Sequence, residues 1–270
     1  MSATTSSDRI TSHFAAMAGE GRRALVVYLT AGYPTPGSFV ELMRGVAAAG
    51  ADVIEVGVPF SDPVADGPVI QASSQSALDA GVTLSHTLEF IREAALNIPV
   101  VLFSYLNPII SAGPDVLERA AACGVSGLLV TDLPLGADSE LEERLSSGPL
   151  AFVRLVAPTT PVERMAEIGR NGSGFVYLIS RLGVTGTRES LPVELADTIA
   201  RLRSVTSLPI CVGFGIATPD QAAEVAGMAD GVIVGSAVVR AAGESVQKAV
   251  DLVAQLRAGI DSAPTGRQEP

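Results

Sequence analysis

The feature that most constrains the fold is a repeat of short apolar, β-branched runs separated by turn residues and helical segments. The runs cover residues 24–29, 52–56, 100–103, 127–131, 151–156, 175–179, 209–212 and 231–234. Helical spacing is clearest at residues 38–49, 137–145, 161–168, 193–205 and 219–226. Apolar strands that alternate with helices are typical of a parallel sheet covered by helices. Eight such units predict an α/β fold, a (β/α)8 TIM barrel with additional short helices.

An open, doubly wound sheet is the alternative fold, but no Gly-x-Gly-x-x-Gly fingerprint follows the first run. No linker or shift in composition divides the chain. We therefore expect residues 1–270 to form one domain. The polar start, residues 1–8, and the Gly- and Pro-containing tail, residues 257–270, are expected to be loose ends.

Composition excludes several classes of protein. A net charge of -11 and a pI near 4.6 argue against a general binder of nucleic acids or anionic membranes. No apolar stretch approaches the roughly 20 residues of a membrane span, and the start lacks the pattern of a secretory signal. Cys123 and Cys211 lie in apolar surroundings and are interpreted as core residues. Together these features favour a cytoplasmic protein.

The inventory of basic side chains limits the possible chemistry. Lys248 is the one lysine and falls in a C-terminal helical segment, residues 245–256, so no Schiff base is expected in the barrel. His13 and His86 lie far apart and outside any metal-binding spacing. Carboxylates, tyrosines and backbone dipoles must therefore carry any catalysis.

The second run carries Glu55 in its apolar middle, and Asp66 follows in a Pro-rich loop. If Glu55 points into the barrel, the apolar surroundings raise its pKa and allow it to donate a proton. Asp66, nearer the mouth of the barrel, is expected to stay ionised. The two carboxyl groups therefore predict an acid/base pair. The alternative is that Glu55 pairs with an Arg in the core and Asp66 only caps a helix.

Glycines follow the seventh and eighth runs, in the segments 212–216 and 234–237. Barrel enzymes often bind phosphate with these two loops, where backbone N–H groups meet a helix N-terminus. The pair of segments favours a phosphate site, and simple tight turns are the alternative.

Further candidates surround the mouth of the predicted barrel. The segment 180–188 has two glycines among small polar residues, which is typical either of a loop that closes over a ligand or of a plain surface loop. Tyr177 precedes it, and Tyr28 and Tyr105 belong to the first and third units. Core packing is the alternative for each tyrosine.

These residues resemble the tryptophan synthase alpha chain family. The likeness is most specific in Ile54-Glu55-Val56-Gly57 and the following residues 60–67, and it spans roughly residues 10 to 255 in the expected order. It continues in Thr-Ala-Gly-Tyr-Pro at 30–34, Thr-Asp-Leu-Pro at 131–134, Ser-Arg-Leu-Gly-Val-Thr-Gly at 180–186 and Gly-Phe-Gly at 213–215.

The resemblance implies a carbon–carbon lyase that cleaves indole-3-glycerol phosphate to indole and glyceraldehyde 3-phosphate in tryptophan biosynthesis. By matching position it implies catalytic roles for Glu55 and Asp66, with Tyr177 nearby. The implied substrate-binding residues are Tyr28, where many members carry Phe, together with Phe103, Tyr105, Leu129, Thr185 and Phe214. The implied phosphate-binding residues are Gly186, Gly215, Gly235 and Ser236.

The resemblance also implies a partner. No cofactor is expected in this subunit, and indole would pass to a pyridoxal-phosphate-dependent beta chain in an α2β2 complex. The expected interface comprises the loop residues Pro59, Asp62 and Pro63 and the turn residues Asn107 and Pro108. Three alternatives remain open: a free-standing lyase that releases indole, another phosphate-binding barrel isomerase, and a non-catalytic barrel that regulates a partner.

Overall fold

The computed structural model describes residues 6–180, 194–213 and 215–263. Eight parallel strands close into a barrel in chain order, with β8 hydrogen-bonded to β1. The strands are β1 (Ala24–Thr30), β2 (Val53–Gly57), β3 (Val100–Ser104), β4 (Gly127–Val130), β5 (Ala151–Val156), β6 (Val176–Ile179), β7 (Ile210–Gly213) and β8 (Gly231–Val234). The predicted (β/α)8 barrel is confirmed, and the eight predicted runs coincide with the strands to within one residue at each end.

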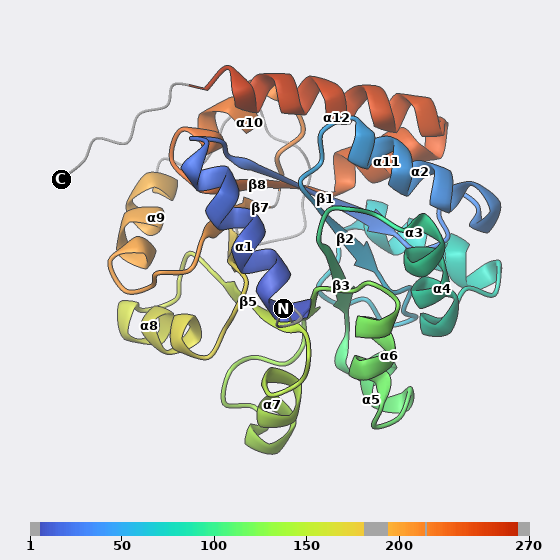
Figure 1. The fold of residues 1–270 in the computed structure, drawn as a ribbon, viewed down its shortest axis with the longest axis horizontal. Coiled ribbons are helices and arrows are strands. Elements are labelled where there is room, and N and C mark those ends of the chain that lie inside the picture. The colour runs from blue at the N-terminus through green and yellow to red at the C-terminus, as the bar shows by residue number, and fades with distance from the viewer. Residues whose placement is uncertain (1–5, 181–193, 214, 264–270) are drawn as a thin grey trace, which may run out of the picture.

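Helices surround the barrel (Figure 1). They are α1 (Ser6–Gly19), α2 (Pro36–Ala48), α3 (Pro68–Asp79), α4 (Leu84–Ala94), α5 (Leu106–Ser111), α6 (Val116–Ala122), α7 (Ser139–Ser146), α8 (Val162–Arg170), α9 (Leu195–Arg203), α10 (Pro219–Ala226), α11 (Ser236–Glu244) and α12 (Val246–Asp261). Proline opens α2, α3 and α10, where its missing N–H costs no hydrogen bond. Gly50 and Gly124 follow α2 and α6 with φ of +109° and +98°, a conformation that favours glycine.

Side chains alternate between two apolar layers along each strand. Val53 of β2 points into the barrel with Val26 of β1 and Val101 of β3, whereas Ile54 and Val56 face the surrounding helices. Glu55 is two residues from Val53 and therefore also faces the interior. This alternation explains why a charged residue can occur in a strand without disturbing the contact between sheet and helices.

Helix α1 closes the N-terminal end of the barrel. Its Ile10, Phe14 and Met17 belong to the interior cluster, and the Phe14 ring lies 5.6 Å from the ring of Phe175. In Figure 1 this helix crosses in front of the strands. Because this end is covered, the opposite end, formed by the loops that follow the strands, is left for ligands.

The expected loose ends are wrong where the structure describes them. Helix α1 already begins at Ser6, and α12 continues to Asp261. Arg257 is only 8% exposed, and its Nη1 lies 2.8 Å from Oδ2 of Asp52. The aliphatic part of Arg257 covers Gly50, where a built Cβ would lie 2.6 Å from its Cγ. A polar tail sequence concealed this contact because the partner residues lie some 200 positions earlier.

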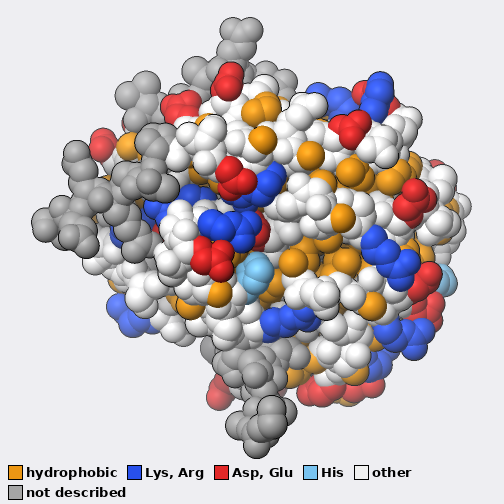
Figure 2. Space-filling view, turned by 45° about the horizontal axis from the view of Figure 1, so that its top comes forward, with side chains coloured by type: hydrophobic (Ala, Val, Ile, Leu, Met, Phe, Trp, Pro, Cys, Tyr) orange, Lys and Arg blue, Asp and Glu red, His pale blue; other side chains and the backbone are white. Residues whose placement is uncertain are grey.

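The Arg257 pair belongs to a charged cluster at the closed end of the barrel. Asp52 also accepts a hydrogen bond from the Leu25 N–H at 2.8 Å and pairs with Arg22 at 3.2 Å. Figure 2, in which the top of Figure 1 is turned toward the reader, shows acidic and basic side chains intermixed on this part of the surface. The cluster attaches α12 to the start of β2.

We expect Arg257→Met to lower the free energy of unfolding by about 2 kcal/mol, because Asp52 loses a buried, charged hydrogen-bond donor. Arg22→Met is the matched control: that side chain is 42% exposed, so its loss should cost less than about 1 kcal/mol. Urea denaturation at neutral pH measures both values. Equal losses for the two variants would contradict the assignment of the buried contact.

Candidate active site

Glu55 is an isolated carboxyl group inside the barrel. It is 0% exposed, and within the described part of the chain neither of its carboxyl oxygens has a hydrogen-bond partner. In register it lies beside Tyr28 of β1 and Val101 of β3. Burial raises the pKa of Glu55 to about 8, because the charged form loses its hydration. The group is therefore protonated near neutral pH, as the sequence predicts, and the alternative of a core Arg partner is not what these contacts show.

Asp66 lies in the loop between β2 and α3 and is half-buried. Tyr105 donates from Oη to Oδ2 of Asp66 at 3.0 Å, and the Ala65 N–H donates to the same Tyr105 oxygen at 2.9 Å. Burial raises the pKa of Asp66 to about 6, and the hydrogen bond from Tyr105 opposes that rise. Asp66 is thus mostly ionised at pH 7, whereas Glu55 is mostly protonated. The structure gives the two carboxyl groups the different states that an acid/base pair needs.

Tyr28 and Tyr177 enter the same interior from β1 and β6, and both are buried. Burial raises the pKa of each hydroxyl, and the nearby charges of Glu55 and Asp66 add to the effect. Their positions depend on two glycines, Gly57 and Gly213, whose role in making room for the hydroxyls was not predicted from the sequence. A Cβ built at Gly57 would overlap the hydroxyl of Tyr28, and one at Gly213 would overlap that of Tyr177. A glycine at an inward strand position was the available signal.

An apolar wall adjoins the two carboxyl groups. The rings of Tyr28 and Phe103 meet edge to face, with centroids 5.2 Å apart, across the register position of Gly57. Leu129 of β4 is buried in the same interior cluster. The Phe60 ring lies 5.1 Å from that of Tyr105. A flat aromatic ligand would find a matching surface here.

The candidate phosphate residues lie at the ends of two paired strands, β7 and β8. Gly215 follows β7 with φ of +85°, and a Cβ built there meets nothing within 4 Å. Gly235 follows β8 and directly precedes Ser236, the first residue of α11, which carries no acidic residue in its first turn. The positive end of the α11 dipole is therefore available to an anion. Thr185, Gly186 and Phe214 lie outside the described residues.

The residues expected at an interface are only partly accessible. Asp62 and Asn107 are exposed and Pro63 and Pro108 half-buried, but Pro59 is buried and presents little surface. Asn107 and Pro108 belong to the short helix α5, so the expected turn is wrong. Two apolar side chains are exposed in or beside the same segments, Val64 at 83% and Ile110 at 43%.

The geometry agrees with the comparisons with known proteins. Residues 14–263 match the family described as tryptophan synthase alpha chain. The chain belongs to the tryptophan synthase alpha chain family. It is 45% identical over 241 residues to a tryptophan synthase alpha chain of Desulfatibacillum aliphaticivorans, covering 88% of this chain and 91% of that one.

Solved structures give the same result. A Mycobacterium tuberculosis tryptophan synthase chain matches with a TM-score of 0.86 and 35% identity, over 93% of this chain and 98% of that chain. Tryptophan synthase subunit alpha of Legionella pneumophila matches with a TM-score of 0.85 and 34% identity, over 94% and 98%. The tryptophan synthase alpha reaction is a carbon–carbon lyase reaction, the cleavage of indole-3-glycerol phosphate, and this chain is a lyase subunit of that kind.

The described residues contain neither a cluster of metal ligands nor a membrane-spanning helix. No three or more His, Cys, Asp or Glu side chains among them come together in a way that could hold a metal ion. None of the helices that the structure describes has the length and apolar character needed to cross a membrane.

The raised pKa of Glu55 predicts a pH-dependent stability. The folded protein keeps the Glu55 proton up to about pH 8, whereas the unfolded chain releases it near 4.5. This contribution to the free energy of unfolding is therefore full at low pH and is lost as pH rises through that interval. Glu55→Gln cannot ionise, so its stability relative to the wild type should increase by about 4 kcal/mol between pH 4.5 and pH 8.

Urea denaturation of both proteins at several pH values measures this difference, in which all other titrating groups cancel. A difference that stays constant with pH would show that Glu55 is already ionised in the folded protein.

Proposed function

We propose that Glu55 is the proton donor in the cleavage of indole-3-glycerol phosphate and that Asp66 stabilises the charge that develops on the indole ring. The observation that supports this most strongly is the Glu55 carboxyl group, which is fully buried and unpaired among the described residues. Such a group is costly for folding, and catalysis is the simplest reason to keep it.

The cleavage requires two proton transfers. Glu55 donates its proton to C3 of the indole ring, which produces a cationic indolenine. A base, which the ionised Glu55 can supply, removes the proton from the hydroxyl on the adjacent side-chain carbon. The carbon–carbon bond breaks, its electron pair restores the aromatic ring of indole, and the hydroxyl carbon becomes the aldehyde of glyceraldehyde 3-phosphate.

Asp66 is suited to a second role because it is ionised when Glu55 is not. Its carboxylate would accept the indole N–H and stabilise the positive charge, which appears only after protonation at C3. Tyr105 holds this carboxylate by its hydrogen bond. Tyr177 and Tyr28 would contact the substrate beside Glu55, and Phe103 and Leu129 would form the apolar wall.

Glu55→Gln should lower the lyase turnover by roughly 10²- to 10⁴-fold while the protein remains folded, because an amide cannot deliver the proton. Asp66→Asn should also be severely impaired, because an amide cannot balance the indolenine charge. Steady-state assays with indole-3-glycerol phosphate measure both effects. If the Glu55→Gln variant retained more than about a tenth of the wild-type turnover, another group would have to be the acid.

We also propose that the loops after β7 and β8 bind the substrate phosphate through Gly215, Gly235 and Ser236. The support is the exposed start of α11 and the open space at Gly215. Gly186 and Thr185 are assigned to the same site and to its lid only by their match to the family.

Gly235→Ala should raise KM by about tenfold or more, because a methyl group covers the backbone that the phosphate approaches. The fold should tolerate the change, since the new Cβ would lie 3.4 Å from its nearest neighbour. Gly19→Ala at the closed end, where a Cβ meets nothing within 4 Å, is the matched control. Inorganic phosphate should compete with substrate less well in Gly235→Ala. Equal affinity of the wild type for phosphorylated and dephosphorylated ligands would disprove the site.

We propose that the chain works in the cytoplasm without a cofactor of its own and passes indole to a pyridoxal-phosphate-dependent beta chain in an α2β2 complex. The exposed apolar side chains Val64 and Ile110 support an interface at this end of the barrel. Asp62 and Asn107 would contribute polar contacts to this interface, and Pro63 and Pro108 would lie beside them. Pro59 is buried and would support the loop that carries Asp62.

Mixing the chain with a purified beta chain should yield a complex and a higher lyase turnover, because docking would hold the loop of Asp66 in its active position. Asp62→Ala or Pro63→Ala should weaken this activation more than substrate binding. Asp251→Ala, on the exposed side of α12, is the control and should change neither. Absence of both co-elution and activation would favour the free-standing lyase.

A further inference from the structure

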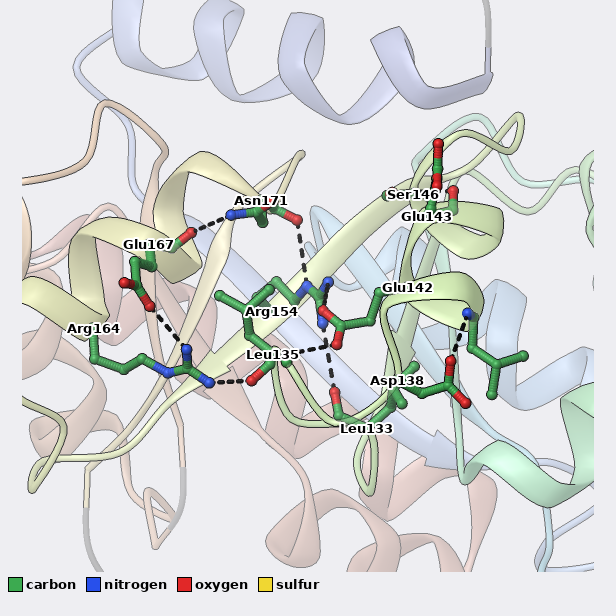
Figure 3. A network of polar contacts seen from close by, with 12 residues as sticks. Leu133, Leu135, Asp138, Glu142, Glu143, Ser146, Arg154, Arg164, Glu167 and Asn171 are labelled. Carbon is green, nitrogen blue, oxygen red and sulfur yellow. Dashed lines mark hydrogen bonds and ion pairs between the residues drawn. The ribbon is translucent and has the colours of Figure 1, made fainter.

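A buried ion pair lies outside the barrel, between β5 and the helices α7 and α8 (Figure 3). Arg154 of β5 donates from Nη2 to Oε2 of Glu142 in α7 at 2.9 Å. The two residues are 5% and 7% exposed. The Arg154 guanidinium also lies 4.1 Å from the centre of the Phe152 ring and donates from Nε to the Asn171 carbonyl at 3.3 Å. Burying two charges is expensive, so the pair calls for a reason beyond packing.

The pair holds the loop that follows β4. Arg154 Nη1 lies 3.5 Å from the carbonyl oxygen of Leu133, and Oε1 of Glu142 accepts the Gly136 N–H at 2.6 Å. Arg164 of α8 donates to the carbonyl of Leu135 in the same loop (Figure 3). Backbone groups at three positions between 133 and 136 are thus attached to α7, α8 and β5.

The same loop reaches the active site through its first residues. Oδ1 of Asp132 accepts the N–H of Leu106, the first residue of α5, at 2.7 Å. Tyr105 directly precedes Leu106, and its hydroxyl donates to Asp66. Hydrogen bonds and short backbone segments therefore connect the Arg154–Glu142 pair to the carboxylate of Asp66 at the mouth of the barrel.

We propose that Arg154 is a positioning residue for the lyase reaction. With Glu142 it fixes the loop after β4, and through Asp132 and Tyr105 this loop fixes the carboxylate of Asp66. The proposal rests on the function proposed above for Asp66.

The chemistry of the pair suits this task better than an apolar contact does. Two apolar side chains would fill the same space, but without hydrogen bonds they would not fix the position and orientation of the loop backbone. A guanidinium presents its donors in one plane, and the carboxylate accepts from two sides. Glu142 uses one oxygen for Arg154 and the other for Gly136, so the position of the strand determines that of the loop.

Arg154→Met tests the proposal, because it keeps an unbranched apolar stem in place of the aliphatic part of Arg154 and removes the guanidinium donors. The control is Arg257→Met, which breaks a buried pair of the same kind at the closed end of the barrel. Both variants should unfold at lower urea concentration. Only Arg154→Met should raise the pKa of Asp66, since a displaced Tyr105 no longer stabilises the carboxylate. NMR titration of the Asp66 carboxyl carbon measures this shift without any need for turnover.

Kinetics provide the second readout. Arg154→Met should lower kcat by about tenfold, because small misplacements of a catalytic group are costly, and should change KM much less. Glu142→Gln should act in the same direction with a smaller effect, and Arg154→Lys should restore part of the loss. In a Tyr105→Phe background, Arg154→Met should cause no further rise in the pKa of Asp66.

Unchanged Asp66 titration and kcat in both Arg154→Met and Glu142→Gln, with only stability reduced, would overturn the proposal. The proposal would also be overturned if Arg154→Met raised the pKa of Asp66 as much in the Tyr105→Phe background as in the wild type. If Arg154→Met does not fold, the milder Glu142→Gln decides the question by the same titration. A wild type that fails to cleave indole-3-glycerol phosphate would refute the proposed function, while the titration would still decide whether Arg154 positions Asp66.

Discussion

The chemistry of the site depends on one constraint, the burial of an unpaired carboxyl group among the largely apolar side chains of the barrel interior. In the described part of the chain Glu55 has neither water access nor a hydrogen-bond partner, so it keeps its proton at pH values where an exposed carboxyl group is ionised. The fold accepts this cost because eight strands and their helices bury enough apolar surface elsewhere. A local rule of stability is thus broken at the residue that we propose as the catalytic acid.

The two ends of the barrel contribute differently to the surroundings of the buried Glu55 carboxyl group. At the N-terminal end, α1 inserts Ile10 and Phe14 into the interior, and the Asp52–Arg257 pair attaches α12. This end excludes water from the base of the barrel. At the opposite end, Tyr105 holds Asp66 at the surface of the same interior. The closed end therefore helps to maintain the raised pKa of Glu55, and the ligand site that we propose lies at the opposite end, beside Asp66.

Much of the architecture could be predicted because strand and helix patterns are local. The eight apolar runs, the Pro-initiated helices and the glycines after α2 and α6 all follow from neighbouring residues. The predictions that were wrong involve distant residues. The tail at residue 257 is anchored by Asp52, and the expected turn at Asn107 is a helix whose first N–H is capped by Asp132. No window along the chain contains both partners.

The sequence by itself determined the barrel, the inward direction of Glu55 and the family, because each is written in residue spacing or in a local motif. The tertiary structure decided which carboxyl groups of the site are protonated. Glu55 is unpaired because no described side chain reaches it. The ionised form of Asp66 is partly stabilised because Tyr105, which follows β3, donates a hydrogen bond to its carboxylate. The tyrosine hydroxyls have room only because Gly57 and Gly213, two residues further along the neighbouring strands, carry no side chain. Protonation depends on burial and on neighbours in space, and these exist only once the barrel has closed.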